Sequence, residues 1–269
     1  MVAYFVRYLK RFGVLVVGLV AIVILAVSIF PFWDKRVPFI IALFFTWIIG
    51  AYILFPLAVR IIRVFVRPHH IPLHTVTPDG FACDPVNVGI VGSLQELRDA
   101  MEKAGWYEAD PRTLGTLWHM GISILANRPY PTAPFSPLYL FGRKQDIGFE
   151  MPVQDSPRQR HHVRFWLVDP ATSNARFLLR RHIVPKDRLF WVGAVTQDIG
   201  LGFITHNLQL THKIDPDTNA ERDFLVSCLK KACKGLKIDQ LNSSTPYTLP
   251  NRIRTITMIA DGRLTLCEL

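Results

Sequence analysis

Cysteine is scarce in this sequence, with four residues among 269. They form no Cys-x-x-Cys pair, and their positions do not match the spacing of a zinc-binding motif. This scarcity excludes a small disulfide-stabilised fold. Free thiols in a reducing cytosol are the expected state of Cys83, Cys228, Cys233 and Cys267.

Several catalytic signatures are also missing. The sequence has no G-x-S-x-G, no Walker loop, no glycine-rich dinucleotide fingerprint and no H-E-x-x-H. Known serine-hydrolase, nucleotide-binding and zinc-peptidase motifs are therefore excluded, and no cofactor is indicated. No metal site is expected, because no spacing among the histidines and aspartates requires a shared ion.

Charge is absent from two long apolar segments, residues 12–33 and 37–59, which only residues 34–36 separate. At ~1.5 Å rise per residue, a helix of about 22 residues is ~33 Å long, enough to cross a bilayer core. A cleavable signal peptide is disfavoured, because the first segment is too long for one. The two segments predict a transmembrane hairpin anchor over residues 1–66.

Basic residues flank this hairpin on its outer side. Three precede the first segment and three follow the second: Arg7, Lys10, Arg11, Arg60, Arg63 and Arg67. The positive-inside rule then predicts a multi-pass protein of the inner (plasma) membrane with both termini cytoplasmic. The lipid bilayer is thus the first expected partner. Neither segment contains an ionisable group, which argues against a transport pathway or a proton relay.

The basic excess of the chain belongs mainly to this anchor. Residues 1–67 hold eight of the 31 Lys and Arg and one of the 21 acidic residues, which leaves 23 basic and 20 acidic residues in the remainder. A nearly balanced soluble part does not predict nucleic acid as a partner.

After the hairpin, residues 67–80 are rich in helix and strand breakers and are predicted to be a linker. Residues 81–269 have the size of one domain. A capping box, Ser93 with Glu96, predicts a helix over 93–104. The other expected elements are helices over 112–126 and 215–232, strands near 86–90, 137–142, 146–152, 160–168, 189–197 and 203–214, and a final hairpin turning at Asp261-Gly262. This pattern predicts an α+β soluble domain preceded by a two-helix transmembrane hairpin.

The predicted strand 160–168 has two contrasting faces. Its apolar face, which must be buried, carries Val163, Phe165 and Leu167. The opposite face carries Arg160, His162, Arg164 and Trp166. Neighbouring cations repel unless something negative neutralises them. The basic residues therefore either pair with the domain's own acids or form a cradle for a phosphate or carboxylate.

Two further segments contain candidate site residues. In 204–214, His206 and His212 share the apolar face about 20 Å apart, so at least one is expected to be a core histidine. The turn from Arg143 to Asp146 would place an arginine and a carboxylate at the rim of the same sheet. Asp198, at the end of strand 189–197, is another candidate carboxylate.

Four motifs in order carry a family resemblance. They are Asp84-Pro85-Val86-Asn87-Val88, the run from Tyr139 to Asp146, the run from Arg160 to Trp166, and Ile214-Asp215-Pro216-Asp217 followed by Glu221-Arg222-Asp223-Phe224. Together they resemble the bacterial LssY-like C-terminal domain family over about residues 75–235. The resemblance implies a domain often joined to multi-span membrane portions, some of which resemble lipid phosphatases. This chain has a two-span hairpin instead, so the resemblance leaves the activity open.

The leading hypothesis is a membrane-tethered cytoplasmic domain that binds an anionic group near the bilayer. The ligand would be a lipid head group or a phosphorylated metabolite. The expected ligand-binding residues are Arg143, Arg160, His162 and Arg164.

Two alternatives remain open. In a hydrolase acting on a phosphoester or related bond, His162 or His206 would be the acid or base and Asp146 or Asp198 would orient it. In a non-enzymatic scaffold, the chain would bind membrane proteins in a membrane or secretion-associated complex. A large exposed apolar patch on the soluble domain would favour the scaffold.

Overall fold

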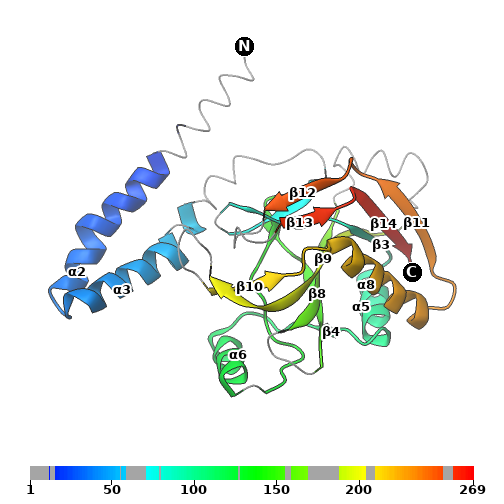
Figure 1. The fold of residues 1–269 in the computed structure, drawn as a ribbon, viewed down its shortest axis with the longest axis horizontal. Helices are drawn as coiled ribbons and strands as arrows, with labels where there is room; N and C mark the ends of the chain where they lie inside the picture. The colour runs from blue at the N-terminus through cyan, green and yellow to red at the C-terminus, as the bar shows by residue number, and fades with distance from the viewer. Residues whose placement is uncertain are drawn as a thin grey trace, which may run out of the picture. The chain divides into compact units, whose positions relative to one another are not determined.

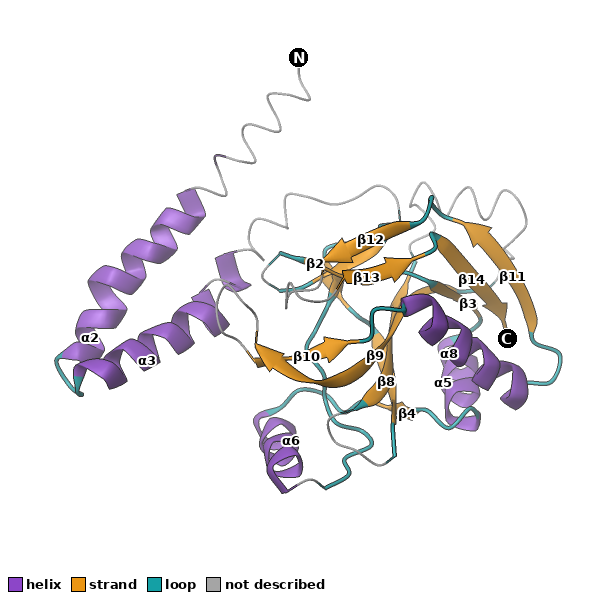
Figure 2. Cartoon of the chain, viewed as in Figure 1, coloured by secondary structure: helices purple, strands orange, loops and turns teal. Residues whose placement is uncertain are grey.

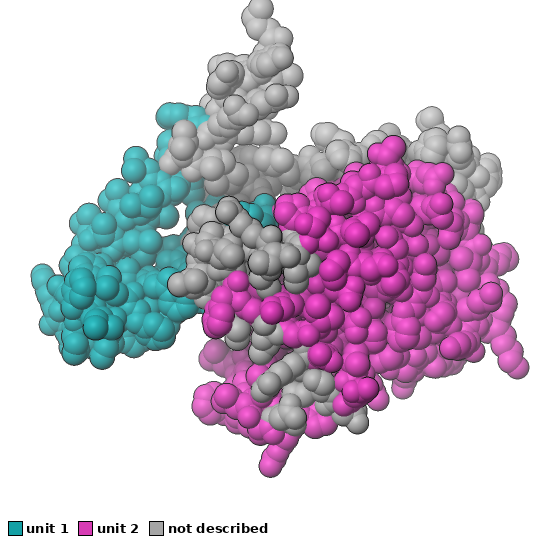
Figure 3. Space-filling view, viewed as in Figure 1, with its two compact units in different colours: residues 1–67, 77–81 teal, residues 68–76, 82–269 magenta. Residues whose placement is uncertain are grey.

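The computed structural model of this chain describes residues 12, 16–54, 56–58, 71–78, 80–126, 128–154, 159–168, 188–203, 210–250 and 257–269. Two units are distinguished in Figure 3. One comprises residues 1–67 with 77–81, and the other comprises residues 68–76 with 82–269.

The first unit contains the two expected apolar helices, Val16–Asp34 and Phe39–Ala58 (Figure 1). By length and composition, each is long and apolar enough to cross a membrane. Their labelled parts are η1 (Leu25–Ile29), α2 (Phe30–Asp34), α3 (Phe39–Ile49) and η2 (Gly50–Leu54). The predicted pair of apolar helices is therefore confirmed, whereas its insertion into a bilayer stays a prediction.

The second unit is built on one large sheet with strand order β11-β14-β3-β9-β8-β7-β4, and β10 pairs with β9. All these pairs are antiparallel except β14 with β3. The strands are β3 (Val88–Val91), β4 (Tyr107–Glu108), β7 (Ile147–Pro152), β8 (Arg160–Leu167), β9 (Phe190–Phe203), β10 (Leu210–Ile214), β11 (Lys237–Asn242) and β14 (Arg263–Glu268).

Two helices, α5 (Leu94–Lys103) and α8 (Thr218–Ala232), lie over one face of the large sheet, which we call the helix face (Figure 2). The capping box of Ser93 and Glu96 starts α5 as predicted. The core on this face includes Phe149, Val163, Phe165, Leu97 and Leu225. The apolar side of the 160–168 strand is thus buried here, as its alternation predicts.

The other face of the large sheet is also buried, and we call it the small-sheet face. A second sheet has the order β2-β1-β5-β6 and consists of β1 (His74–Val76), β2 (Ala82–Pro85), β5 (Tyr139–Leu140) and β6 (Arg143–Lys144). A core of residues from both sheets, including Trp166, Val192 and Leu140, lies between them. Strand β1 lies within residues 67–80, which were expected to be a linker. Residues 74–76 of that segment therefore belong to the small sheet.

The remaining predicted helix, α6 (Leu114–Ala126), forms and is placed at the edge of the second unit (Figure 1). One expected strand boundary is corrected at Asp198. Strand β9 continues through Asp198 to Phe203 rather than ending at residue 197, because it gains β10 as a new partner there. Residues 204–209, with His206, lie outside the described residues.

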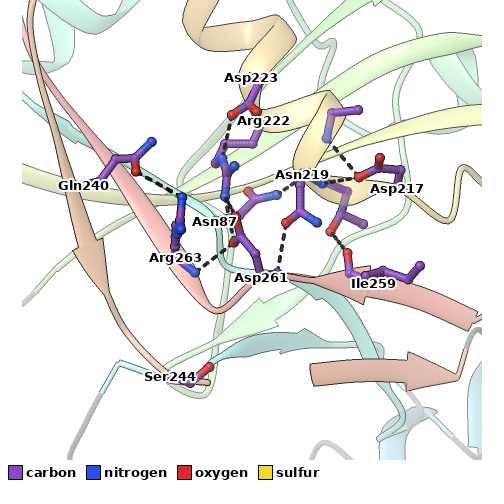
Figure 4. Close-up of polar contacts among 12 residues, drawn as sticks. Asn87, Asp217, Asn219, Arg222, Asp223, Gln240, Ser244, Ile259, Asp261 and Arg263 are labelled. Atoms are coloured by element: carbon purple, nitrogen blue, oxygen red, sulfur yellow. Dashed lines mark hydrogen bonds and ion pairs between the residues drawn. The ribbon is translucent and has the colours of Figure 1, made fainter. Parts of the chain in front are cut away.

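The Asp261-Gly262 turn forms, but the hairpin predicted around it is wrong. β13 (Thr257–Ala260) pairs with β12 (Tyr247–Pro250), whereas β14 pairs with β11 and β3. The turn is fixed to α8 instead, because Arg222 Nη1 donates to both carboxylate oxygens of Asp261 at 2.8 and 2.9 Å (Figure 4). The backbone N–H of Asp261 also donates to Asn219 Oδ1 at 3.0 Å.

Candidate functional site

Eight polar residues meet on the small-sheet face, and we call them the buried polar cluster. They come from β2, β7, β8, β9 and β10: Asp84, Glu150, Arg160, His162, Arg164, Thr196, Asp198 and His212. Strand register brings them together. Arg160 lies opposite Asp198, and His162 lies between Glu150 on β7 and Thr196 on β9.

Arg160 is held between two carboxylates. Its Nη1 is 2.6 Å from Glu150 Oε2, and its Nε is 3.2 Å from Asp198 Oδ2. All three side chains are at most 6% exposed. The guanidinium therefore pairs with the domain's own acidic side chains, which was one of the two expectations for this strand.

Arg164 pairs with the third carboxylate. Its Nη1 donates to Asp84 Oδ2 at 3.0 Å, and its Nη2 donates to the Ser136 carbonyl at 3.3 Å. The Phe135 ring covers it, with its centroid 4.4 Å from the guanidinium carbon. Room for this ring comes from Gly148, where a Cβ would overlap the Phe135 ring.

Two histidines face Asp198. The Nδ1 atoms of His162 and His212 lie 3.4 and 3.5 Å from Asp198 Oδ2. His162 Nε2 shares a 2.8 Å hydrogen bond with Thr196 Oγ1. The His162 side chain is 3% exposed, whereas that of His212 is 26% exposed. His212 is therefore the member of the cluster through which solvent reaches it.

The carboxylates of the cluster have opposite pKa shifts. Burial alone would raise the pKa of both Asp84 and Asp198, but the adjacent His162 and arginines hold both below the ordinary aspartate value. Burial raises the pKa of Glu150 to about 8, and the pairing with Arg160 opposes this rise without reversing it. Glu150 thus carries a proton at neutral pH, while the two aspartates are ionised.

The histidines also differ. Burial would lower the pKa of His162, but Asp198 outweighs it and raises that pKa above the ordinary histidine value. Burial lowers the pKa of His212. The guanidinium groups of Arg160 and Arg164 balance the ionised Asp84 and Asp198, and a proton held by His162 adds positive charge to the cluster.

Unused hydrogen-bonding capacity is concentrated in the same place. Among the described residues, seven buried side-chain nitrogen or oxygen atoms have no hydrogen-bond partner, and four belong to this cluster: Glu150 Oε1, His162 Nδ1, Arg164 Nε and His212 Nδ1. Each can donate a hydrogen bond when Glu150 is protonated and the histidines carry hydrogen on Nδ1. The cluster therefore contains four atoms that a hydrogen-bond acceptor could satisfy.

The structure does not bring every candidate residue to this cluster. Arg143 pairs with Asp146, and Asp146 Oδ2 accepts the backbone N–H of Leu167 at 2.6 Å. This places both residues at the far end of β8, five residues or about 17 Å from His162. Arg143 and Asp146 hold the Leu167 end of β8 in place. Among the described residues they do not form one site with His162, as the sequence-based hypothesis expected.

Sequence reasoning missed Asp84, Glu150 and Thr196. Glu150 had a usable signal, because it alternates with Phe149 and must lie on the opposite face. Asp84 lies in a family motif, although nothing local links it to β8. Within the described part of the chain, no group of three or more His, Cys, Asp and Glu side chains is arranged to hold a metal ion.

Comparison with known proteins gives one match. The model of a family described as LssY C-terminus matches residues 68–263. This match extends the resemblance seen in the sequence to include β11, β12 and β13. No curated protein and no solved structure matches significantly.

Proposed function

The chain belongs to the LssY C-terminal family, and from this premise we propose that it is a membrane-tethered cytoplasmic domain that binds a small anionic, phosphate-bearing ligand near the bilayer. The two apolar helices with basic residues on their outer side support the tether. The observation that carries the ligand is the buried polar cluster with its four unpartnered nitrogen and oxygen atoms.

Burial of so many ionisable groups is costly. A buried ion pair often stabilises a fold less than apolar residues of the same volume would. Shifted pKa values and desolvated charges are, in contrast, common at functional sites. An oxyanion would satisfy the unpartnered donors, which favours a binding role for the cluster.

The ligand would enter beside His212, since Arg160 and Arg164 lie in ion pairs deeper inside. His212 is therefore the best residue to change. Its partial exposure makes the fold tolerant of substitution, whereas truncating either arginine would leave a buried carboxylate unpaired.

The test uses the full chain in detergent, with inorganic phosphate and glycerol phosphate as probes. A ligand at 100 times its Kd adds ~2.7 kcal/mol, or about 5–10 °C in melting temperature for a domain of this size. We expect that shift in the wild type and in His119→Gln, and its loss in His212→Gln. His119 is exposed and stacks on Tyr130, so it is a matched control. Equal shifts in both variants, or none in the wild type, would reject the site.

A second candidate function is hydrolysis of a phosphoester, which the position of Asp198 between two histidines favours. A neutral His212 beside an ionised Asp198 could accept a proton from water. Turnover of p-nitrophenyl phosphate by the wild type, and a loss of at least ~100-fold in His212→Gln, would support an enzyme. Binding without turnover would leave the protein a binding module.

A further inference from the structure

Helix α6 presents its apolar residues to solvent. Leu114, Trp118 and Leu125 are 90%, 74% and 87% exposed, and Ile122 is 44% exposed. Of the 13 residues of the helix, Ser123 is the buried one. The usual arrangement of an amphipathic surface helix is therefore inverted.

The four apolar residues form one continuous stripe. Their spacing of four, four and three residues places them within about 80° of one another around the helix, and Ser123 lies on the opposite side. We call Leu114, Trp118, Ile122 and Leu125 the α6 stripe. A stripe of this kind is typical of a helix that contacts another apolar phase.

The orientation of α6 is fixed by contacts at both ends. Thr113 Oγ1 accepts the Thr116 N–H at 3.1 Å and caps the first turn. At the other end the Arg128 N–H donates to the Ser123 carbonyl at 2.9 Å, and the Tyr130 ring stacks on His119 with centroids 4.2 Å apart. The domain therefore holds the stripe outward.

The charge around α6 is basic. No Asp or Glu occurs between Pro111 and Gln145, and that stretch includes Arg112 and Arg128, which flank the helix and are exposed. The carboxylate next to it, Asp110, accepts hydrogen bonds from Tyr130 and Thr132. This surface is complementary to a negatively charged one.

We propose that α6 lies in the interface of an anionic lipid bilayer, with the α6 stripe inserted among the acyl chains and the flanking arginines at the phosphates. An apolar face with a tryptophan and basic residues beside it is the composition of an interfacial helix. The inference rests on the proposed membrane tether, which would keep α6 at a high effective concentration near the bilayer.

A protein groove is the competing partner, since an exposed apolar patch also suits a scaffold. The basic flanks and the lack of Asp and Glu in residues 111–145 favour lipid, because protein rims mix both signs and the cytoplasmic leaflet is uniformly negative. Lipid charge therefore discriminates between the two.

The test is hydrogen exchange of the full chain in nanodiscs of phosphatidylglycerol or of phosphatidylcholine. We expect amides 114–126 to exchange about tenfold more slowly in the anionic discs, which corresponds to ~1.4 kcal/mol. Leu125→Glu should abolish the difference. Ile259→Glu, the same kind of change at an exposed apolar residue on β13, should keep it.

The outcomes separate the inference from its premise. Equal protection of α6 in both lipids would overturn the lipid interface and indicate a protein partner or a second copy. Before hydrogen exchange is measured, gel filtration shows whether the protein elutes with the discs. A protein that elutes apart from them would overturn the membrane tether itself. Slow exchange of α6 in the anionic discs but not in the phosphatidylcholine discs supports both the lipid interface of α6 and the membrane tether.

Discussion

Glu150 provides a sharp test of the electrostatics of the buried polar cluster. The substitution Glu150→Gln keeps the size and the hydrogen bonds of the protonated side chain but cannot ionise. Because Glu150 is fully buried beside Arg160, the variant fixes the cluster in the charge state that the wild type has at neutral pH.

The sign of the pH effect follows from the pKa values. The pKa of Glu150 is raised from an ordinary 4.5 to about 8 in the folded protein. Between these values the folded state holds a proton that the unfolded state releases, so the stability from this group falls as pH rises. The slope for one such proton is ~1.4 kcal/mol per pH unit.

From pH 6 to pH 8 the wild type should therefore lose roughly 2 kcal/mol that Glu150→Gln retains, or about 4–8 °C in melting temperature. His162, whose pKa is also raised, adds a fall of the same sign to both proteins, so the difference between them isolates Glu150. The assay is urea unfolding of both proteins at half-unit pH intervals. Parallel curves across this window would refute the assignment of a protonated Glu150.

Two other substitutions test the packing around the cluster. Arg160→Ala leaves Glu150 and Asp198 without their guanidinium and should lower the free energy of unfolding in urea by ~3–5 kcal/mol. The control Arg98→Ala, which breaks an exposed ion pair, should lower it by less than ~1 kcal/mol. Similar losses in the two variants would mean that burial does not strengthen the Arg160 ion pairs. Gly148→Ala would push a Cβ into Phe135 and should cost ~1–3 kcal/mol, while Gly121→Ala, in open space on α6, should stabilise by up to ~1 kcal/mol. A neutral Gly148→Ala would mean that Phe135 is free to move.

The sequence predicted elements whose signals are local. The capping box of Ser93 and Glu96 predicts the start of α5, and the alternation of apolar and polar residues in β8 identifies Val163 and Phe165 as buried. The second buried face of β8 had no such signal. It is covered by segments such as β2, whose Asp84 is 80 residues away from Arg164 along the chain.

The same limit explains the errors. Asp261-Gly262 has the chemistry of a hairpin turn, and the turn forms. Whether its flanking strands pair depends on competing partners, and β14 is taken by β3 and β11. Arg143 and Asp146 were grouped with His162 because all three were expected in one sheet. In the structure Arg143 lies in β6 of the small sheet, and it and Asp146 lie at the end of β8 that is far from His162.

The most direct measurement is a calorimetric titration of the full chain with sulfate, an anion whose charge is constant from pH 6.5 to 9.5. We expect one saturable site at pH 6.5. At pH 9.5 the affinity should fall at least ~10-fold, because Glu150, whose pKa is about 8, is then ionised and adds a negative charge to the cluster. The absence of binding at pH 6.5, or equal affinity at the two pH values, would contradict an anion site at the buried polar cluster.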